Sequence, residues 1–453
     1  MHLWKRLTRP FRHAPHGRVL RLSPPESLLL GFTLLCLLGS GLLMLPGAAT
    51  QPLAWHQALF TATSAITVTG LAVMDTSSFT TLGQVILLVL IQIGGLGFMT
   101  FGALTLLLLG ARLPLQQQTL VREALGETSF GALSQLVRMV VTFALVVEAL
   151  GTVLLALHWV PELGWSRGLW ASLFHAVSAF NNAGFSLWPD SLTRDAGNPL
   201  VTLVVSGLFI VGGLGFVVIS DVREKRRWGR FSMQTKVVLC ATLAVNLVAM
   251  LALGCLEWHN PATLGGLESL GDKLQAAWFQ AVTPRTAGFN SVDTAAMTDA
   301  SSLLTMLLMF IGGGASSTAS GIKLTTFIVL ILVARAFLRG TQPAAFGRSI
   351  SQQTVMKAIA VALSGVALVF VTLLVLTITD SRQTFLDLAF ESVSAFGTVG
   401  LSRGITEELS SPGQWMLILT MLLGRVGPLS LGYFLATRRT GGMRYAEGHI
   451  QIG

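Results

Sequence analysis

The residues of this chain with the clearest chemical potential lie in four short segments that resemble one another. The segments read FTATSAITVTGL, FHAVSAFNNAGF, FQAVTPRTAGF and FESVSAFGTVGL, and each closes on a glycine followed by Leu or Phe. Backbone carbonyls can replace the hydration shell of a cation, and glycine reaches the φ/ψ values that turn successive carbonyls toward one axis. The candidate coordinating residues, acting mainly through backbone oxygens, are Thr67, Val68, Thr69, Gly70, Asn181, Asn182, Ala183, Gly184, Arg285, Thr286, Ala287, Gly288, Gly397, Thr398, Val399 and Gly400.

The chemistry of these loops indicates which ion they suit. None of the sixteen candidate coordinating residues is Asp or Glu. Rings of Asp or Glu would indicate divalent or weakly selective cation passage, and basic rings would indicate anions. Neutral carbonyl coordination therefore favours K⁺ as the bound ion, while the residues do not locate a Na⁺ site.

A fourfold internal repeat places the loops. The four glycines Gly70, Gly184, Gly288 and Gly400 recur at intervals of 104 to 114 residues. Each is followed by a glycine-bearing segment, IGGLGF, VGGLGF, IGGGAS or LLGRVG, whose first glycine lies 24 or 28 residues after the loop glycine. Ordinary glycine turns would not keep this register, so we expect four similar structural units.

The composition predicts that the units cross a membrane. Of the 453 residues, 52% are hydrophobic and 11% are charged, and the mean hydropathy is +0.69. Apolar runs long enough to span about 30 Å of hydrocarbon recur along the whole chain. Eight crossings are predicted, over residues 28–45, 83–109, 136–157, 200–219, 237–256, 303–337, 359–378 and 416–435.

The elements that must position the loops follow from these runs. An even number of crossings puts both termini on one side, and 22 of the 30 Lys and Arg residues lie there, so this side is cytoplasmic by the positive-inside rule. We therefore expect an all-α integral membrane protein with four helix–pore loop–helix repeats in pseudo-fourfold arrangement around a central ion pore. The predicted boundaries are an amino-terminal arm over 1–23, repeats over 24–110, 133–221, 232–338 and 351–438, and a cytoplasmic tail over 439–453.

The third inner helix is predicted to be broken. The run from Leu303 to Phe337 is too long for one crossing, and its middle is rich in Gly and Ser. An intramembrane loop below the coordinating residues could block the pore and move aside. Two basic residues, Lys323 and Arg425, lie deep in apolar sequence and need polar neighbours. The candidate gate residues are Gly312, Gly313, Gly314, Ala315, Ser316, Ser317, Thr318, Ala319, Ser320, Gly321, Lys323 and Arg425.

Taken together, these motifs resemble the Trk/Ktr/HKT superfamily of K⁺ transporters over the full length. The resemblance rests on TVTGL, NNAGF, TPRTAGFN, GTVGL, GGGASSTASGIK and the closing EGHIQIG. Because the chain lacks the two additional amino-terminal spans of TrkH-type relatives, it is more similar to the Ktr branch. A serine at the position of Gly70 accompanies Na⁺ transport in plant members, so the glycine favours K⁺.

The resemblance also implies partners. It implies a homodimer with one pore per subunit, seated in a bacterial cell membrane on a cytosolic ring of RCK-type regulatory subunits. ATP, ADP or NAD would bind that ring and not this chain, and Na⁺ would stimulate uptake. It further implies that Arg425 latches the gating loop, through carbonyls expected near Gly313 to Ser317.

Other function classes find less support. No nucleophile–base pair, metal constellation, paired histidine or Walker motif is evident, so an enzyme with its own cofactor is not predicted. The basic residues lie in short loops, which favours lipid headgroups over nucleic acid. The alternatives that stay open are a Na⁺-conducting or weakly selective relative and a purely structural membrane protein. Glu148, in the middle of a predicted span, has no assigned mechanism; a buried partner or a contact between subunits would explain it.

Overall fold

The computed structural model describes residues 24–110 and 130–437. The predicted amino-terminal arm, the EGHIQIG motif and the tail lie outside the described residues. Within them the prediction of an all-α fold is confirmed, because the strands are limited to a two-stranded hairpin, β1 (Ala344–Ala345) and β2 (Arg348–Ser349).

Polar caps explain where many helices begin. The Asn198 side chain accepts hydrogen bonds from the backbone N–H groups of Leu200 and Val201, with Pro199 as the first helical residue. Ser232 and Thr298 cap two further helices in the same manner. The interiors are apolar on most sides, as expected of helices surrounded by lipid and other helices.

The helices form sets consisting of an outer helix, a short helix and an inner helix, where the inner helix is broken in two of the sets. The first set is α2 (Pro24–Leu43), α3 (Trp55–Ile66) and α4 (Thr81–Gly110). The second is α6 (Phe130–Leu163), α7 (Trp165–Phe180), α8 (Pro199–Leu214) and α9 (Phe216–Lys225). The third is α10 (Met233–Glu257), α11 (Leu270–Val282), α12 (Asp299–Phe310) and α13 (Leu324–Leu338). The fourth is α14 (Gln352–Thr379), α15 (Phe385–Gly397) and α16 (Ser411–Thr437).

Single 3₁₀ turns mark the connections, at η1 (Thr76–Ser78), η2 (Thr193–Asp195), η3 (Trp228–Arg230) and η4 (Leu264–Gly266).

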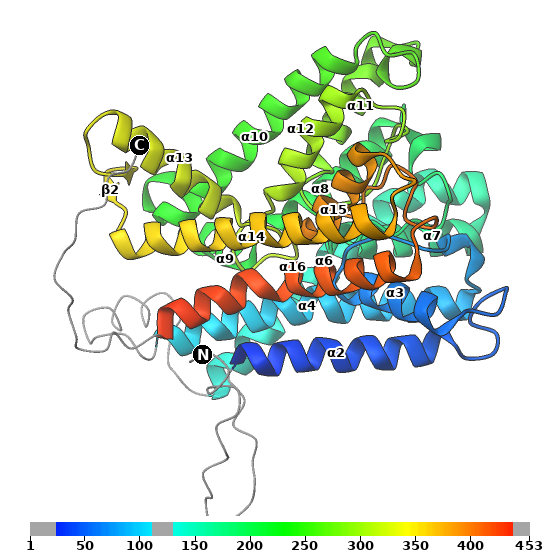
Figure 1. Ribbon diagram of the computed structural model, residues 1–453, viewed down its shortest axis with the longest axis horizontal. Helices are drawn as coiled ribbons and strands as arrows, with labels where there is room; N and C mark the ends of the chain where they lie inside the picture. Colours follow the sequence, from blue (N-terminus) through cyan, green and yellow to red (C-terminus); the bar gives the residue numbers. More distant parts are fainter. Residues whose placement is uncertain (1–23, 111–129, 438–453) are drawn as a thin grey trace, which may run out of the picture.

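Contacts between the sets close into a ring. The first set meets the second through α4 and α6, the second meets the third through α8 and α11, and the third meets the fourth through α12 and α15. The fourth set returns to the first, since α16 packs on α2, α3 and α4. In Figure 1, α2, α4, α16 and α14 run side by side, while α10 rises away from them beside α12. The chain therefore encloses a central region that all four short helices reach.

The described helices are those of a multi-pass membrane protein. Four spans are long and apolar enough to cross a membrane: Thr81–Phe98, Val137–Leu163, Met233–Glu257 and Gln352–Thr379. The bent pair α8 and α9 would count as a fifth, and shorter apolar helices cover Leu28–Leu43, Asp299–Phe310 and Leu324–Leu338. The count of eight crossings stays a prediction.

The second inner helix differs from its prediction. An unbroken span over 200–219 was expected, but α8 and α9 meet at a bend of 92°. The break falls at Gly215, whose φ of 92° and ψ of 144° leave the helical region. A Cβ at this glycine would overlap the carbonyl oxygen of Ala315. The lack of a side chain at Gly215 therefore lets the polar segment of the third set pack against the break.

Candidate functional site

Each of the four glycine loops follows a short buried helix, and hydrogen bonds fold the loop back on that helix. The Thr69 N–H donates to the Ser64 carbonyl at 2.8 Å, and the Ala183 N–H donates to the Ser178 carbonyl at 2.8 Å. The corresponding bonds in the third and fourth loops join Ala287 to Thr283 and Val399 to Ser394, both at 2.9 Å. Because the carbonyl end of a helix carries a partial negative charge, each loop starts where a cation is favoured.

All four loops share an unusual backbone. A residue other than glycine takes a positive φ two positions before each loop glycine, at Val68 (56°), Asn182 (60°), Thr286 (74°) and Thr398 (45°). The glycines follow with φ between 69° and 94°. Left-handed conformations are costly for β-branched residues, about 1–3 kcal/mol each, and persist where the surrounding structure imposes them. A backbone with left-handed residues at these two positions could turn carbonyls toward one axis, as carbonyl coordination would require.

The loop glycines face one another in a closed cycle. A Cβ added to Gly70 would lie 2.5 Å from the Ala183 oxygen and 3.1 Å from the Gly184 Cα. One added to Gly184 would lie 3.0 Å from the Gly288 Cα. Gly288 in turn faces the Val399 oxygen, and Gly400 faces the Thr69 oxygen and the Gly70 Cα. The structure thus brings all four loops to one place, where a Cβ would overlap a neighbouring loop at Gly70, Gly288 and Gly400 and would crowd one at Gly184.

A hydroxyl closes each loop, which the sequence reasoning missed. The Gly70 and Gly400 N–H groups donate to the Ser64 and Ser394 hydroxyls at 3.1 and 3.2 Å. Ser178 and Thr283 instead donate to the carbonyls of Phe185 and Phe289. The sequence contains a pattern that could have predicted these hydroxyls, because a Ser or Thr recurs near the end of each short helix, five or six residues before the loop glycine.

The second glycine landmark of each repeat has a packing explanation in three repeats. Added Cβ atoms at Gly94, Gly212 and Gly424 would overlap the carbonyls of Ile66, Phe180 and Phe396. Those carbonyls belong to the final turn of α3, α7 and α15. The inner helix therefore needs glycine where the end of the short helix rests on it.

The side chains at the first loop position differ in their surroundings. Thr67 bonds within its own loop, to Thr63 and Thr69. Asn181 bonds outward to Gln92 and Glu148. Arg285 is buried behind the third loop, and its Nε and Nη1 atoms find no acceptor among the described residues.

The predicted break in the third inner helix is present between α12 and α13. Residues Gly312 to Gly321 form a buried segment whose ends pair, through the Gly312 N–H to the Ile322 carbonyl at 2.8 Å. The segment also bonds to the break at Gly215: the Gly314 N–H donates to the Gly213 carbonyl at 2.8 Å, and the Phe216 N–H donates to the Ser316 carbonyl at 3.1 Å. The two broken helices thereby satisfy each other's backbone groups at membrane depth.

Arg425 holds this segment from the far side. The guanidinium, 1% exposed, donates to the Thr318 carbonyl, to the Ser320 hydroxyl at 2.9 Å and to the Gly94 carbonyl at 3.4 Å. The expected partners were carbonyls near Gly313 to Ser317, so the contact lies further along the chain than predicted. The carbonyls of Gly313, Gly314 and Ser316 instead accept from the Leu324 N–H, the Ser317 hydroxyl and the Phe216 N–H.

Lys323 secures the carboxyl end of the segment. Its ammonium group donates to the Ala319 carbonyl at 2.5 Å and lies 5.4 Å from the Phe98 ring centroid. The Arg425 guanidinium lies 4.5 Å from the same ring. One aromatic ring therefore lies close to both cations, the buried Arg425 and the partly buried Lys323.

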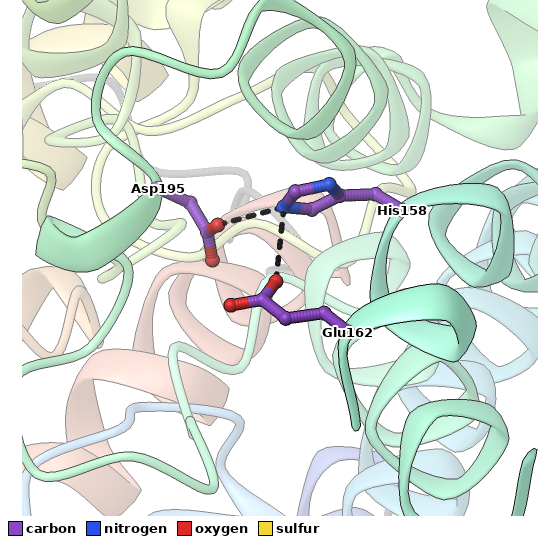
Figure 2. Close-up of side chains that lie close together, drawn as sticks. All are labelled: His158, Glu162 and Asp195. Carbon is purple, nitrogen blue, oxygen red and sulfur yellow. Dashed lines mark hydrogen bonds and ion pairs between the residues drawn. The ribbon is translucent and has the colours of Figure 1, made fainter. Parts of the chain in front are cut away.

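A polar cluster at the end of α6 was also missed. His158 was expected to be unpaired, but its Nε2 lies 3.0 Å from Asp195 Oδ1 and 3.5 Å from Glu162 Oε2 (Figure 2). Asp195 also accepts from the Trp159 indole at 3.2 Å. These side chains tie α6 to η2, and in the described part of the chain they form the group whose ligand atoms, within 4.8 Å of one another, could hold a metal ion. Spacing in the sequence could not reveal it, because Asp195 comes from a different connection.

Acidic residues that follow the loops include Asp75 after the first and Glu407 after the fourth. Partial burial, and then the nearby Asp75 carboxylate, raise the pKa of Glu407.

Comparison with known proteins identifies the family. The TrkH family model, described as cation transport protein, matches residues 32–438. The chain is 49% identical to a protein of Bacillus subtilis named Ktr system potassium uptake protein B, over 96% of this chain and 97% of that one. It is 38% identical to the potassium/sodium uptake protein NtpJ of Enterococcus hirae, over 96% of this chain and 98% of the relative.

A solved structure supports the fold. The potassium transporter TrkH of Vibrio parahaemolyticus matches with a TM-score of 0.73 at 20% identity, over 94% of this chain and 87% of that one. The relatives are transporters and not enzymes. The chain belongs to the TrkH family of cation transport proteins, within the Trk/Ktr superfamily.

Proposed function

We propose that this chain is the pore-forming subunit of a K⁺ uptake system, with the four glycine loops as its selectivity filter. The observation that carries the proposal is the closed cycle of loop glycines, each preceded by a left-handed residue. Relatives named as potassium uptake proteins, which align over nearly the whole chain, support K⁺ as the ion.

The backbone would do the coordination. Carbonyl oxygens of the loops replace water around K⁺, and the ends of α3, α7, α11 and α15 add a favourable potential. Buried carboxylates are not needed at the filter, which keeps the site neutral when no ion is bound.

The segment from Gly312 to Gly321 would act as the gate. It is linked to the second loop by the Thr318 hydroxyl, which donates to Asn182 Oδ1 at 2.8 Å, and it is held by Arg425. Polar backbone in a buried position, bonded at both ends, supports a segment with two discrete arrangements. The Arg425 charge would repel K⁺ while the segment blocks the path.

The assembly would follow the family pattern: a homodimer in the bacterial cell membrane, both termini cytoplasmic, with a cytosolic RCK-type ring that binds ATP, ADP or NAD. Na⁺ would act as a stimulator, and anionic lipids would contact the basic cytoplasmic loops. This chain itself would carry no cofactor.

The test is rubidium influx into a bacterium that lacks K⁺ uptake and expresses the chain with its regulatory subunit. Wild-type protein should restore growth at low K⁺ and rubidium influx, and Gly70→Asp should abolish both, because any side chain there enters the neighbouring loop. The matched control is Gly404→Asp, since Gly404 has the same left-handed φ of 93° but an added Cβ meets nothing within 4 Å. Full uptake by a well-expressed Gly70→Asp protein would contradict the assignment of the filter.

A second candidate function is passage of Na⁺ beside K⁺. The relative named as a potassium/sodium uptake protein, at 38% identity, favours testing it. Influx of labelled Na⁺ without K⁺ present would distinguish the two, since a K⁺-selective pore passes little Na⁺.

A further inference from the structure

Three polar side chains from different elements meet behind the second glycine loop. Glu148 of α6 accepts through Oε2 from Gln92 Nε2 of α4 at 3.0 Å, and through Oε1 from Asn181 Nδ2 at 3.1 Å. Gln92 Oε1 accepts from the same Asn181 Nδ2 at 2.8 Å. The three form a closed triangle of hydrogen bonds, here named the Glu148 triangle.

The carboxylate of Glu148 is sheltered from lipid. Its side chain is 3% exposed, although Leu145 and Leu150 on the same helix are 54% and 59% exposed. A carboxylate at membrane depth is costly unless it is bonded, and such residues face the interior of the bundle. The direction of Glu148 is therefore set by its partners in the triangle.

Asn181 is fixed from several sides. Its Nδ2 atom also donates to the Val177 carbonyl at 2.9 Å, and so three acceptors compete for two hydrogens. An added Cβ on Gly95 would overlap Asn181 Oδ1, so the inner helix leaves room for this amide. Asn181 is the first residue of the second loop, and Asn182, which has a positive φ, directly follows it. The triangle therefore fixes the side chain next to the left-handed residue.

No matching carboxylate serves the other described loops. Glu391, behind the fourth loop, is also buried, but it bonds Ser402 and Thr406 beyond the loop glycine. The hydroxyl of Thr67, at the equivalent position of the first loop, bonds within its own loop. Support by a carboxylate from an outer helix is thus a property of the second loop within the part of the chain that the structure describes.

We propose that Glu148 is a positioning residue for ion discrimination, which acts on the second loop through Asn181. The inference rests on the proposed function of the loops as a selectivity filter. Discrimination between K⁺ and Na⁺ depends on keeping carbonyls at the spacing of the larger ion, so a loop released from its outer support should accept Na⁺ more readily.

The decisive variant is Glu148→Gln, which keeps size but places an amide NH₂ against one of two donors, Gln92 Nε2 or Asn181 Nδ2. Protein purified with its regulatory subunit and reconstituted in liposomes, matched for amount and elution on gel filtration, would be assayed for rubidium influx and for influx of labelled Na⁺. We expect the ratio of rubidium to Na⁺ influx to fall roughly five- to tenfold, the scale of the net contribution of one hydrogen bond.

Two further variants separate positioning from general packing. Gln92→Met keeps the volume and removes the other side of the triangle, so it should lower the same ratio even if Glu148→Gln does not fold. The matched control is Thr152→Val, one turn along α6, because the Thr152 hydroxyl donates only to the Glu148 backbone carbonyl at 2.8 Å and does not reach the loop. The control should leave the ratio unchanged.

The outcomes distinguish the inference from the function on which it rests. Wild-type liposomes without rubidium influx would overturn the proposed function itself. Normal wild-type selectivity with an unchanged ratio in both Glu148→Gln and Gln92→Met would overturn the role of Glu148. If these variants and Thr152→Val all lost rubidium influx equally, at a constant ratio of rubidium to Na⁺ influx, Glu148 would have only a packing role. That result would also overturn the proposed role in ion discrimination.

Discussion

The first and second glycine loops have nearly the same backbone but are supported differently. Thr67 and Asn181, which open them, share φ of −78° and ψ of −4°, and Val68 and Asn182 have φ of 56° and 60°. The first loop takes its side-chain bonds from residues 63 to 70. The second reaches α4, α6, the third loop and the buried segment.

The difference shows that backbone geometry and its control are separable in this fold. A repeat can keep its loop conformation while one copy acquires hydrogen bonds to elements of other repeats. If the segment from Gly312 to Gly321 is the gate, the second loop is the copy through which a change in it would reach the proposed filter.

The largest expected effect tests the shared backbone. Alanine at Gly70 would adopt φ of 94° and place its Cβ 2.5 Å from the Ala183 oxygen, whereas alanine at Gly184 would meet its nearest atoms at 3.0 Å. Rubidium influx should fall at least about tenfold for Gly70→Ala, the effect of about 1.4 kcal/mol, and by less for Gly184→Ala. Equal influx in the two variants would show that the contact between loops 1 and 2 is not limiting.

The next effect tests the link between the second loop and the proposed gate. Arg425→Gln removes the charge that bonds Thr318 and Ser320, so the segment should leave the pore more often. We expect rubidium influx without the regulatory subunit to rise roughly threefold, as a lost net contribution of about 0.6 kcal/mol would give. Thr318→Val, which loses the bond to Asn182 but keeps the backbone bond to Arg425, should give a smaller rise in the same assay.

A fall in basal influx in both variants would mean that these bonds hold the segment open. That result would reverse the proposed direction of gating and leave the filter assignment untouched.

Much of this architecture could be predicted from the sequence because it is repeated. Four similar segments in register predicted where the four glycine loops lie. The Gly- and Ser-rich run from Gly312 predicted the break between α12 and α13. The break at Gly215 was not predicted, because VGGLGF reads like the unbroken IGGLGF of α4 and only the Ala315 carbonyl, from another repeat, distinguishes the two.

Side-chain partners were harder to predict, because they too come from other repeats. Glu148 lies 33 residues from Asn181 and 56 from Gln92. Periodicity within one helix shows that such a residue turns inward, but not which element of a neighbouring repeat it meets. Arg425 was expected to bond the segment, and its partner carbonyl depended on which ones were already paired with the Leu324 N–H, the Ser317 hydroxyl and the Phe216 N–H.

The smallest expected effect tests the independence of the first loop. Thr67→Val removes a hydroxyl that bonds the Thr63 carbonyl and the Thr69 hydroxyl, both at 2.7 Å, and costs about 1 kcal/mol of local stability. The bonds from Thr69 and Gly70 to Ser64 remain, so the loop keeps its course. The ratio of rubidium to Na⁺ influx should then change by less than about twofold, against five- to tenfold for Glu148→Gln. A shift as large as that of Glu148→Gln would mean that loop 1 depends on its opening side chain as much as loop 2 does, and the contrast between them would fail.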